Sequence, residues 1–317
     1  MTEHAGHGHA QRQAHGQAQE YVREYRVAGP GDGPYALTTG PDGALWFTLV
    51  HSGGIGRLVP GEVPVVHQLA PDCGPSVVCA GPDGALWFTQ YRAHRIGRIT
   101  TAGEVTEFAL PTEECAPFGI AAGPDGALWF TEMNSDRIGR LGTDGTVTEY
   151  RLPLSSAFPS AIAGDQTSMW FTMNQADALG RIDMDGTVTV HELPTAGAAP
   201  VGIATGPDGS VWWTEIAAGQ IGRLTPEGRL TEYPLPDRAA RPHGIAVDTS
   251  GTAWFTEWGG NRIGRVTPDG RFSHYELPTP ESEPHGIAVG PDGAVWTALE
   301  TGALARVAVD DRPADGS

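Results

Sequence analysis

The chain has 317 residues, of which 44 are glycine and 26 are proline; helix interiors tolerate neither residue, so this composition argues against an all-helical protein. The formal net charge of −18 would repel the phosphates of a nucleic acid, and no apolar run approaches the ~18 residues of a membrane span, so neither partner is expected. All 20 basic residues are arginine, which excludes Schiff-base lysine chemistry.

The chain begins with a segment rich in histidine, residues 1–20, which contains His4, His7, His9 and His15 among glycine, alanine and glutamine. This composition predicts a disordered tail, with metal scavenging by the histidines as the alternative. The segment has no apolar core and no cleavage site, so we expect no secretory signal. Three cysteines without metal-ligand spacing (Cys73, Cys79 and Cys115) are expected to be free thiols in a reducing cytoplasm.

A unit of about 42 residues then repeats seven times. Each unit combines an apolar run, a GPDG-type turn, a WFT-type run, an IGR-type run, and a last run such as TVTEYRL. The repeat tryptophans are Trp46, Trp87, Trp129, Trp170, Trp212, Trp254 and Trp296. Four short strands in a period of ~40–45 residues are typical of a β-propeller blade. A solenoid is the alternative, but it needs capping repeats, and the sequence shows none.

The two ends of the repeat region predict that the blades close into a ring. The seventh unit stops after 304–309, without its fourth strand, whereas 24–27 resembles a fourth strand with no unit before it. Paired with the seventh unit, this segment would complete the last blade and remove an open sheet edge. We therefore expect an all-β, seven-bladed propeller with four antiparallel strands per blade over 21–310, and a frayed end at 311–317.

The seven units differ at positions where function is expected. The innermost strand of each unit starts at Pro-X, and the X residues, which should surround one mouth of the central channel, are Tyr35, Ser76, Phe118, Ser160, Val201, His243 and His285. Two neighbouring units thus place histidine, which titrates near neutrality, at equivalent positions. This pairing favours a functional role over a structural one.

Only the seventh unit is acidic at two further positions, with Glu283 before the proline and Glu300 four residues after the tryptophan. If Val289 pairs with Ala294 across the turn, Glu283 lies opposite Glu300, about 5 Å away. Like charges so close require either a proton or a cation, and a hard divalent ion such as Mg²⁺ fits two carboxylates. Strand alternation turns His285 toward the same face as Glu283. The alternative is two exposed loop carboxylates without an ion.

Other charged residues recur from unit to unit and are interpreted as architectural. Glu132, Glu215 and Glu257 each follow a WFT-type run, where they could also surround the channel mouth and attract cations. The arginines of the IGR-type runs are assigned to pairing or hydrogen bonding between blades.

The residues described above resemble the virginiamycin B lyase (streptogramin B lyase) family over 21–309. The resemblance depends on the seven WFT–IGR units, on Gly33-Pro34-Tyr35, on Arg241-Pro242-His243, and on Glu283-Pro284-His285 followed by Glu300. It implies a monomeric, Mg²⁺-dependent lyase that opens cyclic depsipeptide antibiotics at their ester by elimination. Glu283 and Glu300 would be metal ligands, His285 the general acid/base, His243 a second essential histidine in contact with substrate, and Tyr35 a substrate-binding aromatic.

Two other functions remain open from the residues. A propeller lactonase or esterase would use the same carboxylates and histidine but would add water to a cyclic ester. A non-catalytic propeller would bind a peptide or partner at the channel mouth. The mass of the product separates elimination from hydrolysis, and the acidic pair of the seventh unit disfavours the binding module.

Overall fold

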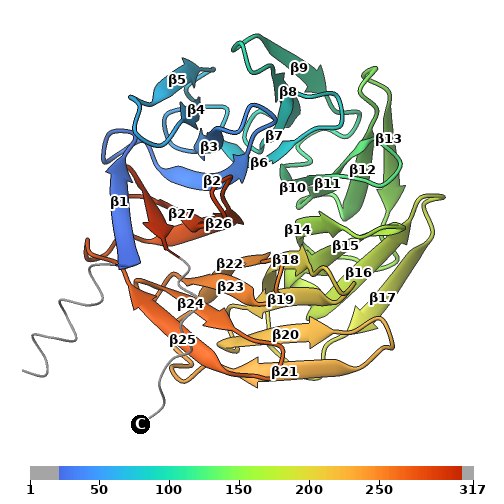
Figure 1. Ribbon diagram of the computed structural model, residues 1–317. Coiled ribbons are helices and arrows are strands. Elements are labelled where there is room, and N and C mark those ends of the chain that lie inside the picture. The colour runs from blue at the N-terminus through green and yellow to red at the C-terminus, as the bar shows by residue number, and fades with distance from the viewer. Residues whose placement is uncertain (1–20, 309–317) are drawn as a thin grey trace, which may run out of the picture.

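The computed structural model describes residues 21–308, which form seven four-stranded antiparallel sheets around a central axis (Figure 1). The expected all-β, seven-bladed propeller is therefore confirmed. Among these residues the only helical element is one 3-10 turn, η1 (Asn174–Ala176), and no helix is long and apolar enough to cross a membrane. The predictions for the tail (1–20) and the C-terminal end (311–317) lie outside the described residues.

The two inner strands of each blade carry the repeated Pro-X and WFT-type segments. The innermost strands are β2 (Pro34–Thr39), β6 (Pro75–Ala80), β10 (Pro117–Ala122), β14 (Pro159–Gly164), β18 (Pro200–Thr205), β22 (Pro242–Val247) and β26 (Pro284–Val289). The second strands are β3 (Leu45–Leu49), β7 (Leu86–Gln90), β11 (Leu128–Glu132), β15 (Ser168–Met173), β19 (Val211–Glu215), β23 (Ala253–Glu257) and β27 (Val295–Leu299). Every second strand is buried along its whole length.

The outer strands carry the IGR-type segments and the polar last segments. The third strands are β4 (Gly54–Leu58), β8 (Arg95–Ile99), β12 (Arg137–Leu141), β16 (Ala178–Asp183), β20 (Gln220–Leu224), β24 (Arg262–Val266) and β28 (Ala303–Val307). The fourth strands of blades one to six are β5 (Val65–Gln68), β9 (Val105–Ala109), β13 (Val147–Arg151), β17 (Val188–Glu192), β21 (Leu230–Pro234) and β25 (Phe272–Glu276).

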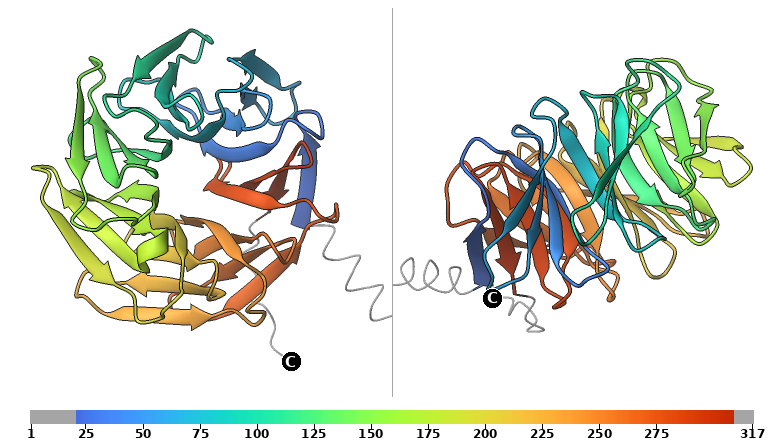
Figure 2. Two further views of the ribbon diagram at one scale, coloured as in Figure 1. Left: turned by 180° about the vertical axis from the view of Figure 1, so that it is seen from behind. Right: turned by 90° about the horizontal axis from the view of Figure 1, so that it is seen from above.

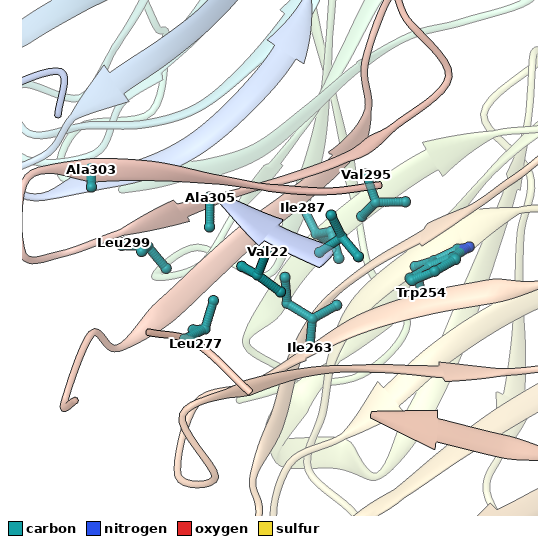
Figure 3. Close-up of a cluster of buried hydrophobic side chains, with 10 residues drawn as sticks. Val22, Trp254, Ile263, Leu277, Ile287, Val295, Leu299, Ala303 and Ala305 are labelled. Carbon is teal, nitrogen blue, oxygen red and sulfur yellow. The ribbon is translucent and has the colours of Figure 1, made fainter. Parts of the chain in front are cut away.

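The N-terminal strand closes the ring as predicted. β1 (Val22–Arg26) pairs antiparallel with β28, from Val22 opposite Val307 to Arg26 opposite Ala303, and becomes the fourth strand of blade seven. From behind, this strand lies beside the strands of blade seven (Figure 2). Its Val22 packs among buried side chains of blades six and seven, including Ile263 and Leu299 (Figure 3). The two ends of the described chain therefore share one hydrophobic cluster.

A buried tryptophan needs a partner for its indole N–H, and in six of the seven blades an aspartate of the turn before the second strand supplies one. In blade one, Trp46 Nε1 donates to Asp42 Oδ1 (3.0 Å), and Arg57 Nε donates to Asp42 Oδ2 (2.7 Å). The same set recurs in blade three as Trp129, Asp125 and Arg140. The IGR-type arginines therefore pair with the turn of their own blade, and the expectation that they pair between blades is wrong for these sets.

Candidate metal and catalytic site

Hydrogen bonds between blades fix the backbone that carries the two histidines. In blades one to six, the threonine of the WFT-type segment donates to the X carbonyl of the next blade, so Thr214 Oγ1 donates to His243 O (2.7 Å) and Thr256 Oγ1 to His285 O (2.8 Å). Gly244, which follows His243, permits the close approach of the two inner strands, because a Cβ at this position would lie only 2.3 Å from the His285 carbonyl oxygen. His243 and His285 thus start neighbouring inner strands at fixed positions.

The residue before each Pro-X has a left-handed backbone in all seven blades. The φ angles of these residues lie between +49° and +65°, a region that favours glycine. Glu283 (φ +49°) and Arg241 (φ +52°) occupy this position in blades seven and six. The propeller frame therefore sets the backbone here, and only the side chain distinguishes the blades.

The predicted register of blade seven is wrong at the turn and correct near the site. Val289 pairs with Val295, not with Ala294. A β-bulge between Pro284 and Ile287 then shifts the register by one residue, so Pro284 lies opposite Leu299. This is the pair that the expected register also gives. His285 lies within this bulge, where no residue pairs with it, in contrast to the expected position opposite Ala298. Bulges commonly re-aim side chains next to sites.

Glu283, His285 and Glu300 form one cluster whose potential ligand atoms all lie within 4.8 Å of one another. His285 Nε2 lies 2.8 Å from Glu300 Oε1, and the hydrogen bond from His285 lowers the pKa of Glu300 to about 2. Partial desolvation and the neighbouring Glu300 carboxylate raise the pKa of Glu283. Two carboxylates and an imidazole nitrogen are suitable ligands for a divalent cation.

His243 and Tyr35 lie against His285. The ring centroids of His243 and His285 are 4.9 Å apart in an edge-on contact, and those of Tyr35 and His285 are 4.6 Å apart. Burial, followed by the charge of His285, lowers the pKa of His243 to about 3, so its ring is neutral near pH 7. Burial also raises the pKa of the Tyr35 phenol far above its usual range. All five predicted site residues therefore meet at one mouth of the channel.

Two hollows adjoin the cluster. The central channel contains a cavity of about 160 Å³ lined by inner strands of all seven blades, including Tyr35 and His243. An open cleft of about 1000 Å³ lies over blades five to seven, and Arg241, Trp258 and Glu283 belong to its lining. Glu283 thus connects the cluster to a cleft large enough for a macrocyclic ligand.

Three residues without an expected site role, Arg241, Trp258 and His51, lie near this cluster. Arg241 lies over the Trp258 ring at 5.2 Å, and the Trp258 ring centroid is 6.4 Å from that of His285. His51 Nε2 is 3.8 Å from Glu300 Oε2 across the seam between blades seven and one. A Cβ at Gly33 would lie 2.3 Å from the His51 ring, so this glycine leaves room for it. His51 is the only histidine five residues after a repeat tryptophan, a signal that could have identified it.

The recurrent glutamates do not line the channel mouth. Glu132, Glu215 and Glu257 are fully buried. Glu257 pairs with Arg262, whereas Glu215 accepts hydrogen bonds from Trp213 Nε1 (2.8 Å) and from a glutamine. These contacts support the architectural interpretation, and the suggested cation-attracting ring is wrong.

Comparisons with known proteins agree with the arrangement. The model of the virginiamycin B lyase family matches residues 20–307. A virginiamycin B lyase of Saccharopolyspora erythraea is 61 % identical over 93 residues, a match that spans 29 % of this chain and 31 % of that protein. The crystal structure of a Staphylococcus aureus virginiamycin B lyase is 38 % identical with a TM-score of 0.87, over 91 % of this chain and 99 % of that one. A catalytically inactive histidine-to-alanine variant of the same enzyme, with quinupristin, is 37 % identical with the same TM-score and coverage. The chain belongs to the virginiamycin B lyase family, and the prediction of an enzyme agrees with the names of these relatives.

Proposed function

We propose that this protein is a lyase that inactivates streptogramin B antibiotics by opening their ester bond through elimination, and so confers resistance. The observation that carries the proposal is the Glu283–His285–Glu300 cluster beside His243, at the edge of a cleft of about 1000 Å³. The family relationship supports the substrate class, because a structural relative contains quinupristin.

The residues of the cluster fit a divalent cation. Glu283 and Glu300 offer hard oxygen ligands. Desolvation and then the neighbouring Glu300 carboxylate raise the pKa of Glu283, and a positive charge between the two carboxylates would offset their repulsion. When bound, Mg²⁺ supplies a Lewis acid that polarises the ester carbonyl. Glu283 and Glu300 would hold it.

We assign the role of the base to His285. The low pKa of Glu300 means that its carboxylate accepts the hydrogen bond, so in the neutral imidazole Nε2 carries the proton and Nδ1 carries the lone pair. Nδ1 is buried without a hydrogen-bond partner among the described residues. Glu300 therefore orients the ring and stabilises the imidazolium that forms when His285 accepts a proton.

The proposed elimination needs no water molecule as a reactant. His285 removes the proton from the carbon next to the one that bears the ester oxygen. That electron pair forms a carbon–carbon double bond, the carbon–oxygen bond breaks, and the carboxylate leaves. His243 is neutral because of its pKa of about 3, so it can contact a polar substrate group without adding charge. Tyr35 provides an aromatic wall beside both rings.

We also propose that the protein acts as a cytoplasmic monomer. One chain supplies every residue of the cluster, and Cys73, Cys79 and Cys115 form no disulfide, as expected in a reducing compartment. Light scattering of the purified protein would test the monomer, and fractionation of the producing cells would test the location.

Mass spectrometry of a streptogramin B incubated with the protein tests the reaction. We expect a linear product of unchanged mass, formed with Mg²⁺ and suppressed by EDTA, and no product with Glu283→Gln. A product heavier by one water would identify a hydrolase such as a lactonase. Binding without any product would favour the non-catalytic alternative.

A further inference from the structure

The segment that leads into the cluster, Thr279–Glu283, is held by side chains from two other elements of the ring. We propose that Glu24 of the closing strand and Asn261 of blade six are positioning residues for the metal site, so that closure of the ring and formation of the site are coupled. This inference rests on the proposed function for the role of the site, and on the following contacts for its geometry.

Glu24 holds the start of the segment from 255 residues away in the sequence. Its Oε1 accepts a hydrogen bond from the Thr279 backbone N–H (3.1 Å), and its Oε2 accepts one from Thr279 Oγ1 (2.5 Å). Hydrogen bonds to a carboxylate are stronger than neutral ones. Glu24 lies in the middle of β1, opposite Ala305, and Val22 of the same strand is buried in the cluster of Figure 3. The position of Thr279 therefore depends on a seated β1.

Asn261 holds the end of the segment. Its Oδ1 accepts a hydrogen bond from the Ser282 backbone N–H (2.7 Å), and its Nδ2 donates to the Thr279 carbonyl (3.0 Å). The Ser282 hydroxyl also donates to this carbonyl, and Ser282 is fully buried. Thr279 and Ser282 are thus tied to each other and to blade six.

Ser282 connects the held segment directly to Glu300 through a backbone hydrogen bond. In the other six blades, the residue four after the tryptophan donates its N–H to the residue just before the proline, as Trp258 does to Arg241. In blade seven, Glu300 donates instead to the carbonyl of Ser282, at 3.0 Å. The segment therefore carries Glu283 as its last residue and fixes the backbone of Glu300. A shift of Thr279 would move both carboxylates.

The same attachment exists in blade three without a site, which provides a matched control. Glu149 accepts hydrogen bonds from the Thr112 backbone N–H (3.1 Å) and from Thr112 Oγ1 (2.6 Å). Thr112 and Thr279 both lie five residues before the proline of their inner strand. A substitution of either threonine removes the same bond from the same frame, but only Thr279 leads to the cluster.

The experiment compares Thr279→Val with Thr112→Val and, as a second pair, Glu24→Ala with Glu149→Ala. The threonine variants keep the side-chain volume and the backbone N–H, so they should fold even if Glu24→Ala opens the ring. Two quantities are measured on each full-length protein: the dissociation constant for Mg²⁺ by calorimetry, and backbone hydrogen exchange over 279–283.

We expect Thr279→Val to weaken Mg²⁺ binding about tenfold, a typical effect of a residue that orients a metal ligand, and to speed exchange over 279–283. Thr112→Val should lower the melting temperature by a similar amount and leave both quantities unchanged. Equal effects of the two variants, or a loss of stability without a change at 279–283, would overturn the inference. If the native protein binds no Mg²⁺, the metal in the proposed function is wrong, and hydrogen exchange alone decides whether Glu24 and Asn261 position the segment.

Discussion

Raising the pH should weaken folding, because two fully buried carboxyl groups resist ionisation. Burial raises the pKa of Glu132 and that of Glu215 from 4.5 to about 7. The folded state therefore binds these protons more tightly than the unfolded state, so stability falls as the pH rises from about 4.5 to about 7 and stays low above it. The difference between the two pKa values corresponds to at most about 3 kcal/mol per carboxyl. Glutamine imitates the protonated acid, so Glu132→Gln should be about 1–3 kcal/mol more stable than the native protein at pH 8.

The free energy of unfolding, measured by urea denaturation at several values between pH 4.5 and 8.5, tests this expectation. The Glu132→Gln curve should be flatter than the native one and should approach it at the acidic end. Glu257→Gln is the control, because Glu257 is equally buried but pairs with Arg262. Its replacement removes the charge that pairs with the half-buried Arg262 and leaves only the longer contact with Asp237 (3.8 Å), so this variant should be less stable than the native protein at pH 8. Parallel curves for Glu132→Gln and the native protein would refute the reasoning.

Three further changes test the site. Glu300→Gln removes a proposed charged ligand and the acceptor of the His285 hydrogen bond. Calorimetry should show at least a tenfold loss of Mg²⁺ affinity, and product analysis should show a loss of turnover of 100-fold or more; native turnover would contradict the proposed role. Thr256→Val removes the hydrogen bond to the His285 carbonyl, so it should lower stability by about 1 kcal/mol and should lower kcat more than it raises KM. The control is Thr89→Val, which removes the equivalent bond to the Phe118 carbonyl; it should lower stability by a similar amount and leave kcat unchanged. His51→Ala should weaken Mg²⁺ binding severalfold if His51 orients Glu300, and an unchanged affinity would show that the contact of 3.8 Å is incidental.

The architecture could be predicted from the sequence because the blades bury the same type of side chain at equivalent positions. A buried indole requires a partner, and the aspartate of the GPDG-type turn supplies it four residues before Trp46, Trp87 and Trp129. Side-chain spacing therefore indicates the turn, the buried strand and the arginine that pairs with the turn. The spacing does not indicate whether a side chain is buried, however. Glu132 and Glu215 each follow a WFT-type run, a position that could equally be exposed in an end loop. The structure shows that each is the fully buried last residue of its strand.

The candidate site could be predicted because the blades share one backbone conformation and differ in their side chains. A comparison of side chains does not, however, detect a change in the hydrogen bonds of the backbone. At the position before Pro-X, all seven blades share one left-handed backbone, so blade seven differs from the others there only in its side chain. A comparison of units within the chain therefore identifies Glu283 directly. The same comparison cannot detect a change of backbone partner. Glu300 donates to Ser282 where other blades use the next residue, and the bulge at His285 compensates an error of one residue at the turn. The same bulge occurs in all seven blades, whereas the change of partner at Glu300 is specific to blade seven. This change involves the segment that Glu24 and Asn261 hold, and Glu24 reaches that segment only because β1 closes the ring.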